Sequence, residues 1–289
     1  MKDMKEQEEY SNQLLYHYTS LKGLLGILNT RCIWATAIED LADETELVYG
    51  RDMWVRRFEL EARKNHGSPL SSRLEKCAKS TKAMPDISEM IRRFDMEPKK
   101  NDSKFKWFIA CFSENKDSLP LWRGFTDHCT GYALGLRYIP PRDLFSDFIH
   151  WPPKRVIYSK LGQRFEILRT VNEACKKLDD PNDPFAWTIP LGRILNIKDR
   201  GFSSEQEWRV VLNNQEPRKF CESTNKPCGV QRDIHYVKLP LTNWEIIEII
   251  CGPRTELHTD DSEIREGIMA FGGQPDNVNV EKSKFRLWR

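Results

Sequence analysis

Near the start of the chain, the apolar positions change from strand spacing to helical spacing within a few residues. The run 16–19 consists of strand formers, and leucines then recur at helical spacing over 21–28. Ser20 stands between them at a helix N-cap position. The pattern predicts a strand with His17 near its end and a helix directly after it. A helix N-terminus offers free backbone N–H groups, so this junction is a place where a phosphate-bearing ligand can be held. A histidine between two aromatic residues is also typical of half-buried packing, and residue type alone leaves both interpretations open.

Strand and helix patterns alternate through the rest of the chain. The almost continuous apolar run 107–113 is typical of a central strand, and 119–122 begins a short helix or turn. Further strands are predicted at 32–35, 131–136, 155–158, 205–212, 235–239, 246–251 and 278–280, and further helices at 162–178, 185–195 and 260–271. This interleaving predicts an α+β fold in one domain spanning 1–289.

Residues 43–106 differ from their surroundings and are predicted to form a helical insertion. Three apolar stripes at helical spacing are separated by polar stretches, and Lys and Arg residues are interleaved with Asp and Glu along them. Such a surface is typical of a solvated helical face. It is also the pattern of a patch for an RNA, DNA or protein partner, so both interpretations stand.

The composition narrows the class of protein. Hydrophobic residues make up 39% and aromatic residues 11% of the chain, which indicates a folded globular protein. Charged residues are 30%, but the net charge is only +2, so the whole molecule has no strong electrostatic preference for nucleic acid or a membrane surface. The first residues lack an apolar segment, and no run approaches the roughly 18 apolar residues of a membrane helix. We therefore expect a cytoplasmic protein with no membrane partner.

The cysteines indicate reduced thiols, without a metal site. Eight cysteines are scattered without a CxxC pair. Cys221, Cys228 and His235 are the only loosely metal-like group, and their gaps are wider than the usual spacing of zinc ligands.

A pair of carboxylates stands where a late strand begins. Glu205, Glu207 and Arg209 alternate, so a strand over 205–212 would point all three toward one face. Two carboxylates with an arginine beside them are a catalytic arrangement. The alternative is an exposed edge strand with a surface ion pair between Glu207 and Arg209.

Several segments, taken in order, resemble the bacterial family catalogued as domain of unknown function 2971. They are LLYHYTSLKGLLGIL, LADETE, ACFSENKDSLPLW, GFSSEQEWRVV, EIICGPRT and the final SKFR. The resemblance covers nearly the whole chain. In the second segment, Ala42 and Glu44 depart from the Asn and Pro that are usual in the family.

A more distant resemblance is to ADP-ribosyltransferases of the histidine type. Tyr16 to Ser20 and the following Gly-Ile-Leu are similar to the first motif of that family, although Tyr18 stands where Gly is usual. Phe112 and Ser113, with Trp122 after a loop, follow the order of the second motif, and Glu205-Gln206-Glu207 has the Glu-x-Glu form found in the arginine-modifying branch.

This second resemblance implies an ADP-ribosyltransferase-like mixed β core and NAD as a substrate, bound without a Rossmann motif. Glu207 would accept from a ribose hydroxyl and stabilise the oxocarbenium ion, His17 would donate to a ribose hydroxyl, and Glu205 would orient or deprotonate the acceptor. The residues implied to contact NAD are His17, Tyr18, Thr19, Ser20, Phe112, Ser113 and Trp122, with Trp122, Phe112 or Tyr132 stacking on nicotinamide.

The activity implied is transfer of ADP-ribose to a protein or nucleic-acid acceptor, with a bacterial toxin or phage-defence effector as the biological role. Two other functions stay open. One is a binding module on the same fold without catalysis. The other is a metal-dependent hydrolase or nuclease that uses Glu205, Glu207 and Asp43 or Asp117 as ligands.

Overall fold

The fold was analysed in a computed structural model. It describes residues 13–41, 44–68, 71–72, 74–75, 78–79, 107–140, 152–177, 193, 195–213, 218–222, 232–256 and 262–286. The predicted stripe at 87–94, nearly all of the predicted helix 185–195 and the segment around Cys228 lie outside these residues.

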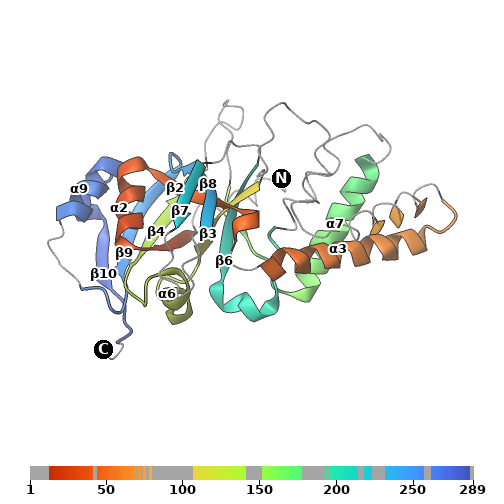
Figure 1. The fold of residues 1–289 in the computed structure, drawn as a ribbon, viewed down its shortest axis with the longest axis horizontal. Helices are drawn as coiled ribbons and strands as arrows, with labels where there is room; N and C mark the ends of the chain where they lie inside the picture. Colours follow the sequence, from red (N-terminus) through yellow and green to blue (C-terminus); the bar gives the residue numbers. More distant parts are fainter. Residues whose placement is uncertain are drawn as a thin grey trace.

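The protein is a mixed α+β structure built on one sheet (Figure 1). Its main path has the order β10-β9-β4-β1-β3-β2-β8-β7, and β6 pairs with the other edge of β3. The strands are β1 (Leu14–Thr19), β2 (Cys32–Ala37), β3 (Trp107–Ser113), β4 (Tyr132–Tyr138), β5 (Lys154–Arg155), β6 (Glu207–Asn213), β7 (Arg218–Glu222), β8 (Arg232–Pro240), β9 (Trp244–Cys251) and β10 (Asn279–Lys282). Only the β9–β10 pair is parallel among the described strand pairs.

Helices cover both faces of the sheet. On one face, α2 (Leu21–Thr30) and α9 (Ser262–Phe271) bury apolar residues against the main core. They approach so closely that a Cβ added to Gly267 would lie 2.8 Å from a side-chain carbon of Leu28. On the other face, α6 (Leu119–Phe125) packs Leu121 and Trp122 against Tyr16 and Tyr18 of β1. The alternation of β1 therefore fixes which of its side chains meets which layer.

The predicted insertion begins with a long helix that packs away from the main core. α3 (Glu44–Lys64) and α7 (Lys160–Lys177) share a second apolar cluster that includes Trp54 and Phe58 of α3 and Ile167 of α7. Figure 1 shows both helices at the end of the molecule opposite α2 and α9. Within the predicted insertion, residues Glu44–Lys64 are thus helical.

The sheet opens between β1 and β2. Among the described pairs, β1 meets β3 at a single position, Tyr16 opposite Ser113, and β2 meets it at Thr36–Ile109 and Ala37–Phe108. Residues 110–112 of β3 therefore have no described strand on that edge, although β6 pairs with all of β3 on the other. At this opening, a stretch of β3 without a strand partner on that edge lies beside the end of β1.

Most predicted elements agree with the structure to within a few residues, and two differ. The strand predicted at 155–158 is reduced to Lys154–Arg155 plus one isolated bridge at Ile157. The strand predicted at 205–212 begins only at Glu207, because residues 200–205 form the 3₁₀ helix η2 (Arg200–Glu205) and Gln206 has φ 43°. Within the described part of the chain, no helix has the length and apolar character needed to cross a membrane.

Candidate functional site

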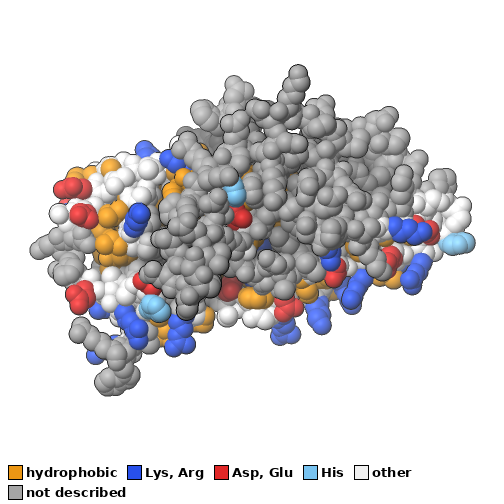
Figure 2. All heavy atoms as spheres, in the orientation of Figure 1, with side chains coloured by type: hydrophobic (Ala, Val, Ile, Leu, Met, Phe, Trp, Pro, Cys, Tyr) orange, Lys and Arg blue, Asp and Glu red, His pale blue; other side chains and the backbone are white. Residues whose placement is uncertain are grey.

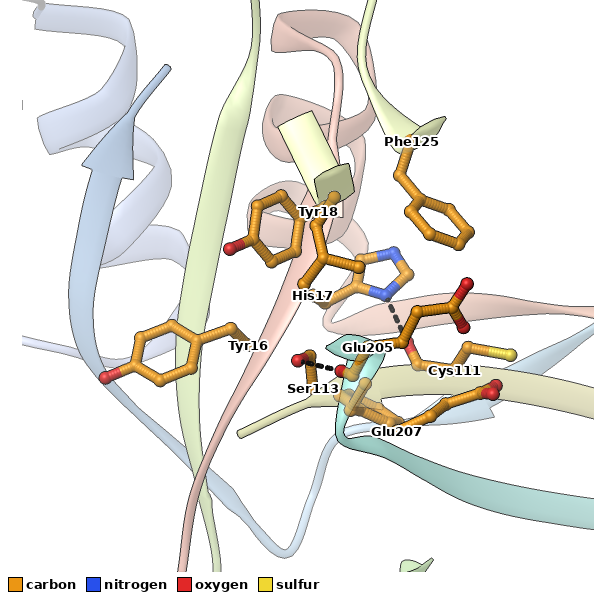
Figure 3. Close-up of a pocket in the computed structure, with 10 residues that line it drawn as sticks. Tyr16, His17, Tyr18, Cys111, Ser113, Phe125, Glu205 and Glu207 are labelled. Atoms are coloured by element: carbon orange, nitrogen blue, oxygen red, sulfur yellow. Dashed lines mark hydrogen bonds between the residues drawn. The ribbon is translucent and has the colours of Figure 1, made fainter. Parts of the chain in front are cut away.

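A pocket lies at the opening between β1 and β3, beside the start of β6. Its volume is about 390 Å³, counting the space open to solvent. Ten residues line it: Tyr16, His17, Tyr18, Cys111, Phe112, Ser113, Leu121, Phe125, Glu205 and Glu207. The pocket thus brings together three segments, each separated from the next by about 80 to 90 residues of sequence. Figure 3 shows His17, Phe125, Cys111 and the two glutamates gathered around this space, while the rings of Tyr16 and Tyr18 point away from it.

His17 fills the break in the strand ladder. Its Nδ1 lies 2.9 Å from the carbonyl oxygen of Cys111. A carbonyl oxygen only accepts hydrogen bonds, so Nδ1 carries a proton and donates it. Burial lowers the pKa of His17, which the bond to Cys111 only partly offsets. The ring is therefore neutral at pH 7, and Nε2 is an acceptor. Nε2 can therefore accept a hydrogen bond but not donate one, the reverse of the donor role expected from the sequence.

Glu207 is buried and held by two cations. It is 5% exposed, and its oxygens accept from Arg209 Nε at 2.8 Å and Arg209 Nη2 at 2.9 Å. Lys198 Nζ lies 3.1 Å from Oε2, and the thiol of Cys111 also donates to this carboxylate. Burial alone would raise the pKa of Glu207, but Arg209, Lys198 and the Cys111 thiol together lower it to about 2.

The ion pair between Glu207 and Arg209 is therefore a buried one. Arg209 is 2% exposed, and its Nη1 donates to the Leu195 carbonyl at 2.6 Å. Glu207 and Arg209 share one face of β6, as their spacing predicts. The alternative of an exposed surface pair is wrong, because β6 lies between β3 and β5 and both side chains are inside.

Glu205 reaches the same cluster from a different backbone position. It is the last residue of η2, outside β6, so its predicted place on the strand is wrong. Its Oε2 nevertheless accepts from Lys198 Nζ at 2.8 Å. Lys198 is 6% exposed and joins both glutamates, and its ammonium also lies 4.7 Å from the ring centroid of Phe202. Glu205 is the more exposed of the two carboxylates, with 20% of its side chain accessible against 7% for Glu207.

Ser113 attaches the end of η2 to β3. Its hydroxyl donates to the Glu205 carbonyl at 2.5 Å and accepts from the Asn115 N–H at 3.0 Å. The position of Glu205 in the pocket thus depends on Ser113, which is a positioning role within the described structure.

The remaining residues of the first motif support the junction. Ser20 caps α2, and its Oγ accepts from the Gly23 N–H at 3.1 Å. Thr19 lies against Gly23, where an added Cβ would come 2.0 Å from the threonine Oγ1. The Tyr18 hydroxyl donates to the Asn115 carbonyl at 2.8 Å. Thr19 and Ser20 are not among the lining residues, and Tyr18 lines the pocket without turning its ring into it.

The aromatic wall of the pocket is Phe125 rather than Trp122. Trp122 is fully buried, donates from Nε1 to Asp117 at 2.7 Å and packs edge-on against Tyr18. Phe112 lines the pocket, but it stacks on Trp244 with centroids 5.0 Å apart. Phe125 is 52% exposed, so its ring is available to a ligand. Tyr132 belongs to the main core.

The metal hypothesis needs several carboxylates to converge on one metal ion, and the described residues do not show this. Among the described residues, no three His, Cys, Asp or Glu side chains converge as metal ligands. Glu205 and Glu207 converge instead on the Lys198 ammonium. Asp117 binds Trp122 and the backbone N–H of Lys284, and Asp43 lies outside the described residues. His235, from the loosely metal-like group, pairs with Asp40 at 2.9 Å.

Four residues of the site were not predicted from the sequence: Lys198, Arg209 as a buried partner, Cys111 and Phe125. Arg209 carried a signal, because its spacing from Glu207 put both on one strand face. Lys198 and Phe125 lie outside the motifs' strands, and only tertiary packing brings them to the pocket.

Comparisons with known proteins identify one family. Residues 121–210 match the family described as "Protein of unknown function (DUF2971)". The match is narrower than the resemblance over nearly the whole chain that the sequence motifs indicate. It includes Glu205 and Glu207 and leaves out the segment of His17. No curated protein and no solved structure matches the chain, so these comparisons add nothing for the resemblance to ADP-ribosyltransferases. The similarity to this family is thus limited to residues 121–210, and the description of the family assigns no activity.

Proposed function

We propose that this protein is an ADP-ribosyltransferase-like enzyme that cleaves NAD at the pocket between β1, β3 and β6. One observation supports the proposal most. The histidine, the apolar-to-polar strand end and the Glu-x-Glu that resemble the three motifs of that family all line a single pocket, although they are far apart in the chain. A chance resemblance of three short segments gives no reason for them to meet.

The chemistry assigned to the residues follows from their protonation states. Cleavage breaks the bond between the ribose C1′ and the nicotinamide nitrogen, and the bonding electrons leave with nicotinamide. The oxocarbenium ion that forms is stabilised by the ionised carboxylate of Glu207. Neutral His17 accepts from a ribose hydroxyl through Nε2, and Phe125 stacks on the nicotinamide ring. The acceptor then attacks C1′ and loses its proton to Glu205.

A second candidate is a binding module without catalysis, and the bonding of Glu207 favours it. A carboxylate has about four acceptor positions. Arg209 takes two, Lys198 takes one and Cys111 takes one. A ribose hydroxyl therefore has to displace one of these donors before it can bind Glu207.

The proposal is tested by following nicotinamide release from NAD by the purified protein, with and without cell extract as a source of acceptors. We expect release that Glu207→Gln and His17→Ala abolish. Because Glu207→Gln also unbalances a buried ion cluster, Glu205→Gln serves as a second variant with a milder effect on folding. Glu245→Gln is the matched control, since that side chain is 54% exposed and lies on β9. A folded wild-type protein that releases no nicotinamide under either condition would leave the binding module as the function.

A further inference from the structure

A row of cations beside the pocket has few acidic partners. Figure 2 shows Lys and Arg side chains along the lower edge of the half of the molecule that carries α3 and α7. On η2, α7 and α3, five exposed cations make no ion pair with a described carboxylate: Arg200, Lys160, Arg164, Arg56 and Arg63. We call these five residues and the exposed apolar side chains between them the basic strip.

The acidic residues of the same helices are largely engaged elsewhere. Asp52 pairs with Arg51 at 3.0 Å. Glu61 pairs with Arg57 and with Lys64 at 2.9 Å. On α7, Glu166 accepts from Arg169 at 3.1 Å. Asp52, Glu61 and Glu166 thus neutralise other cations, whereas Glu59 of α3 and Asp199 beside η2 make no ion pair with a described cation. The five cations outnumber these two carboxylates, so the strip keeps an excess of positive charge although the net charge of the whole chain is only +2.

Large apolar side chains are exposed between these cations. Leu161 is 65% and Phe165 64% exposed on α7, Leu60 is 47% exposed on α3, and Phe202 is 36% exposed on η2. Leu161 and Phe165 are four residues apart and lie on one helix face, next to Lys160 and Arg164. The apolar residues of α3 and α7 that form their shared core lie on other faces, so packing of the helices does not account for this exposure.

The strip is physically connected to the candidate site. η2 carries Arg200 and Phe202 and ends at Glu205, which lines the pocket. The N-terminal turn of α7 is fixed to the same region, because the buried amide of Gln163 donates to the Lys198 carbonyl at 2.7 Å. Gln163 also accepts from the Tyr49 hydroxyl of α3 at 3.0 Å. A polymer lying on the strip would therefore pass close to Glu205.

We propose that the basic strip binds single-stranded nucleic acid. Cations that lack acidic partners bind phosphates, and exposed phenylalanines between them provide surfaces on which unpaired bases stack. A duplex keeps its bases inside and makes no use of the rings. An acidic protein could form ion pairs with the cations, but its binding would not account for the exposed aromatic rings between them. That the bound strand is the acceptor of ADP-ribose rests on the proposed function, whereas the binding itself does not.

The experiment measures the binding of fluorescein-labelled 20-nucleotide RNA and DNA single strands to the purified protein by anisotropy, without NAD. Each phosphate contact contributes about −0.7 to the slope of log affinity against log salt for single strands, so five contacts give about −3.5. Binding should then weaken about 100-fold between 50 and 200 mM salt. Arg164→Ala should reduce the slope by about 0.7. Phe165→Ala should weaken binding about 5- to 150-fold and leave the slope unchanged.

Matched controls lie on α9, at the other end of the molecule. Arg265→Ala removes an exposed arginine, 52% accessible, and Met269→Ala removes an exposed apolar side chain, 55% accessible. Both should leave binding unchanged. The proposal is overturned if no strand binds at 50 mM salt, if the control variants weaken binding as much as Arg164→Ala and Phe165→Ala, or if duplex or polyglutamate competes as well as single strands do.

The two proposals fail separately. Binding of single-stranded nucleic acid without nicotinamide release would support the role of the basic strip and refute the proposal that the bound strand accepts ADP-ribose. Nicotinamide release without binding of single-stranded nucleic acid would support the proposed enzyme activity and refute the role of the basic strip.

Discussion

The buried cluster around Glu207 gives the most exact prediction, because its partners are known atom by atom. Glu207→Gln keeps the size of the side chain and removes the anion that Arg209 and Lys198 share. Both cations are then buried without full compensation. Breaking a buried ion pair in this way costs about 3–5 kcal/mol of folding free energy at pH 7.

The pH dependence of this loss follows from the pKa of Glu207. Its pKa of about 2 in the folded protein is below the ordinary value of 4.5 for a glutamate. The ionised carboxylate therefore stabilises the fold fully above pH 4.5, and the contribution is lost as the pH falls toward 2. A difference of this size corresponds to about 3 kcal/mol at pH 7, and linkage removes about 2 kcal/mol of it by pH 3. The gap between wild type and Glu207→Gln should narrow by that amount.

The assay is urea unfolding at pH 7, 5, 4 and 3, followed by tryptophan fluorescence, on wild type, Glu207→Gln and Glu245→Gln. Other carboxylates also titrate in this range, and taking the difference between wild type and each variant removes their effect. Glu245→Gln, which changes an exposed side chain, should differ only slightly from wild type. A constant gap between wild type and Glu207→Gln from pH 7 to pH 3 would refute the assignment of a buried, cation-held carboxylate.

Three further predictions concern the pocket. The rate of nicotinamide release should fall with decreasing pH only below pH 6.5, because burial lowers the pKa of His17 and only the neutral ring accepts through Nε2. A rate that already falls above pH 6.5 would contradict this. Phe125→Leu should raise the KM for NAD about 2- to 12-fold by loss of stacking, whereas Trp122→Phe should mainly lower the free energy of unfolding by about 1–3 kcal/mol; steady-state kinetics and urea unfolding of both variants separate the two effects. Iodoacetamide should label Cys111 more slowly when NAD is present, with labelling of Cys32 as the internal control by peptide mass spectrometry; equal protection of both thiols would argue against ligand binding at the pocket.

The elements at the pocket were largely predictable because each carries a local signal. The change from strand to helix spacing at Ser20 predicts the β1–α2 junction, and the capping bond to Gly23 confirms it. The apolar run 107–113 coincides with β3. The alternation of Glu207 and Arg209 correctly predicts that they share a strand face.

The differences arise where tertiary context decides. The predicted strand start at Glu205 is wrong because Gln206 takes a left-handed conformation, and a glutamine in the sequence does not predict that conformation. Trp122 and Phe125 stand three residues apart on α6, and the sequence does not say which ring enters the core. Lys198 is in a loop nine residues before Glu207, and only folding brings its ammonium between the two carboxylates.

The donors to Glu207 are unequal, and this decides what the pocket can do. Arg209 and Lys198 bring charge-assisted bonds, and losing either would leave a buried anion partly uncompensated. The Cys111 thiol is a weak donor, and it lines the pocket itself. A ribose hydroxyl that replaces this thiol exchanges a weak bond for a stronger one and leaves both cations in place. NAD binding is thus compatible with the four donors to Glu207 if the Cys111 thiol rotates away from the carboxylate. Because Arg209 and Lys198 remain bound, Glu207 also stays ionised when a hydroxyl replaces the thiol, as the proposed stabilisation of an oxocarbenium ion requires.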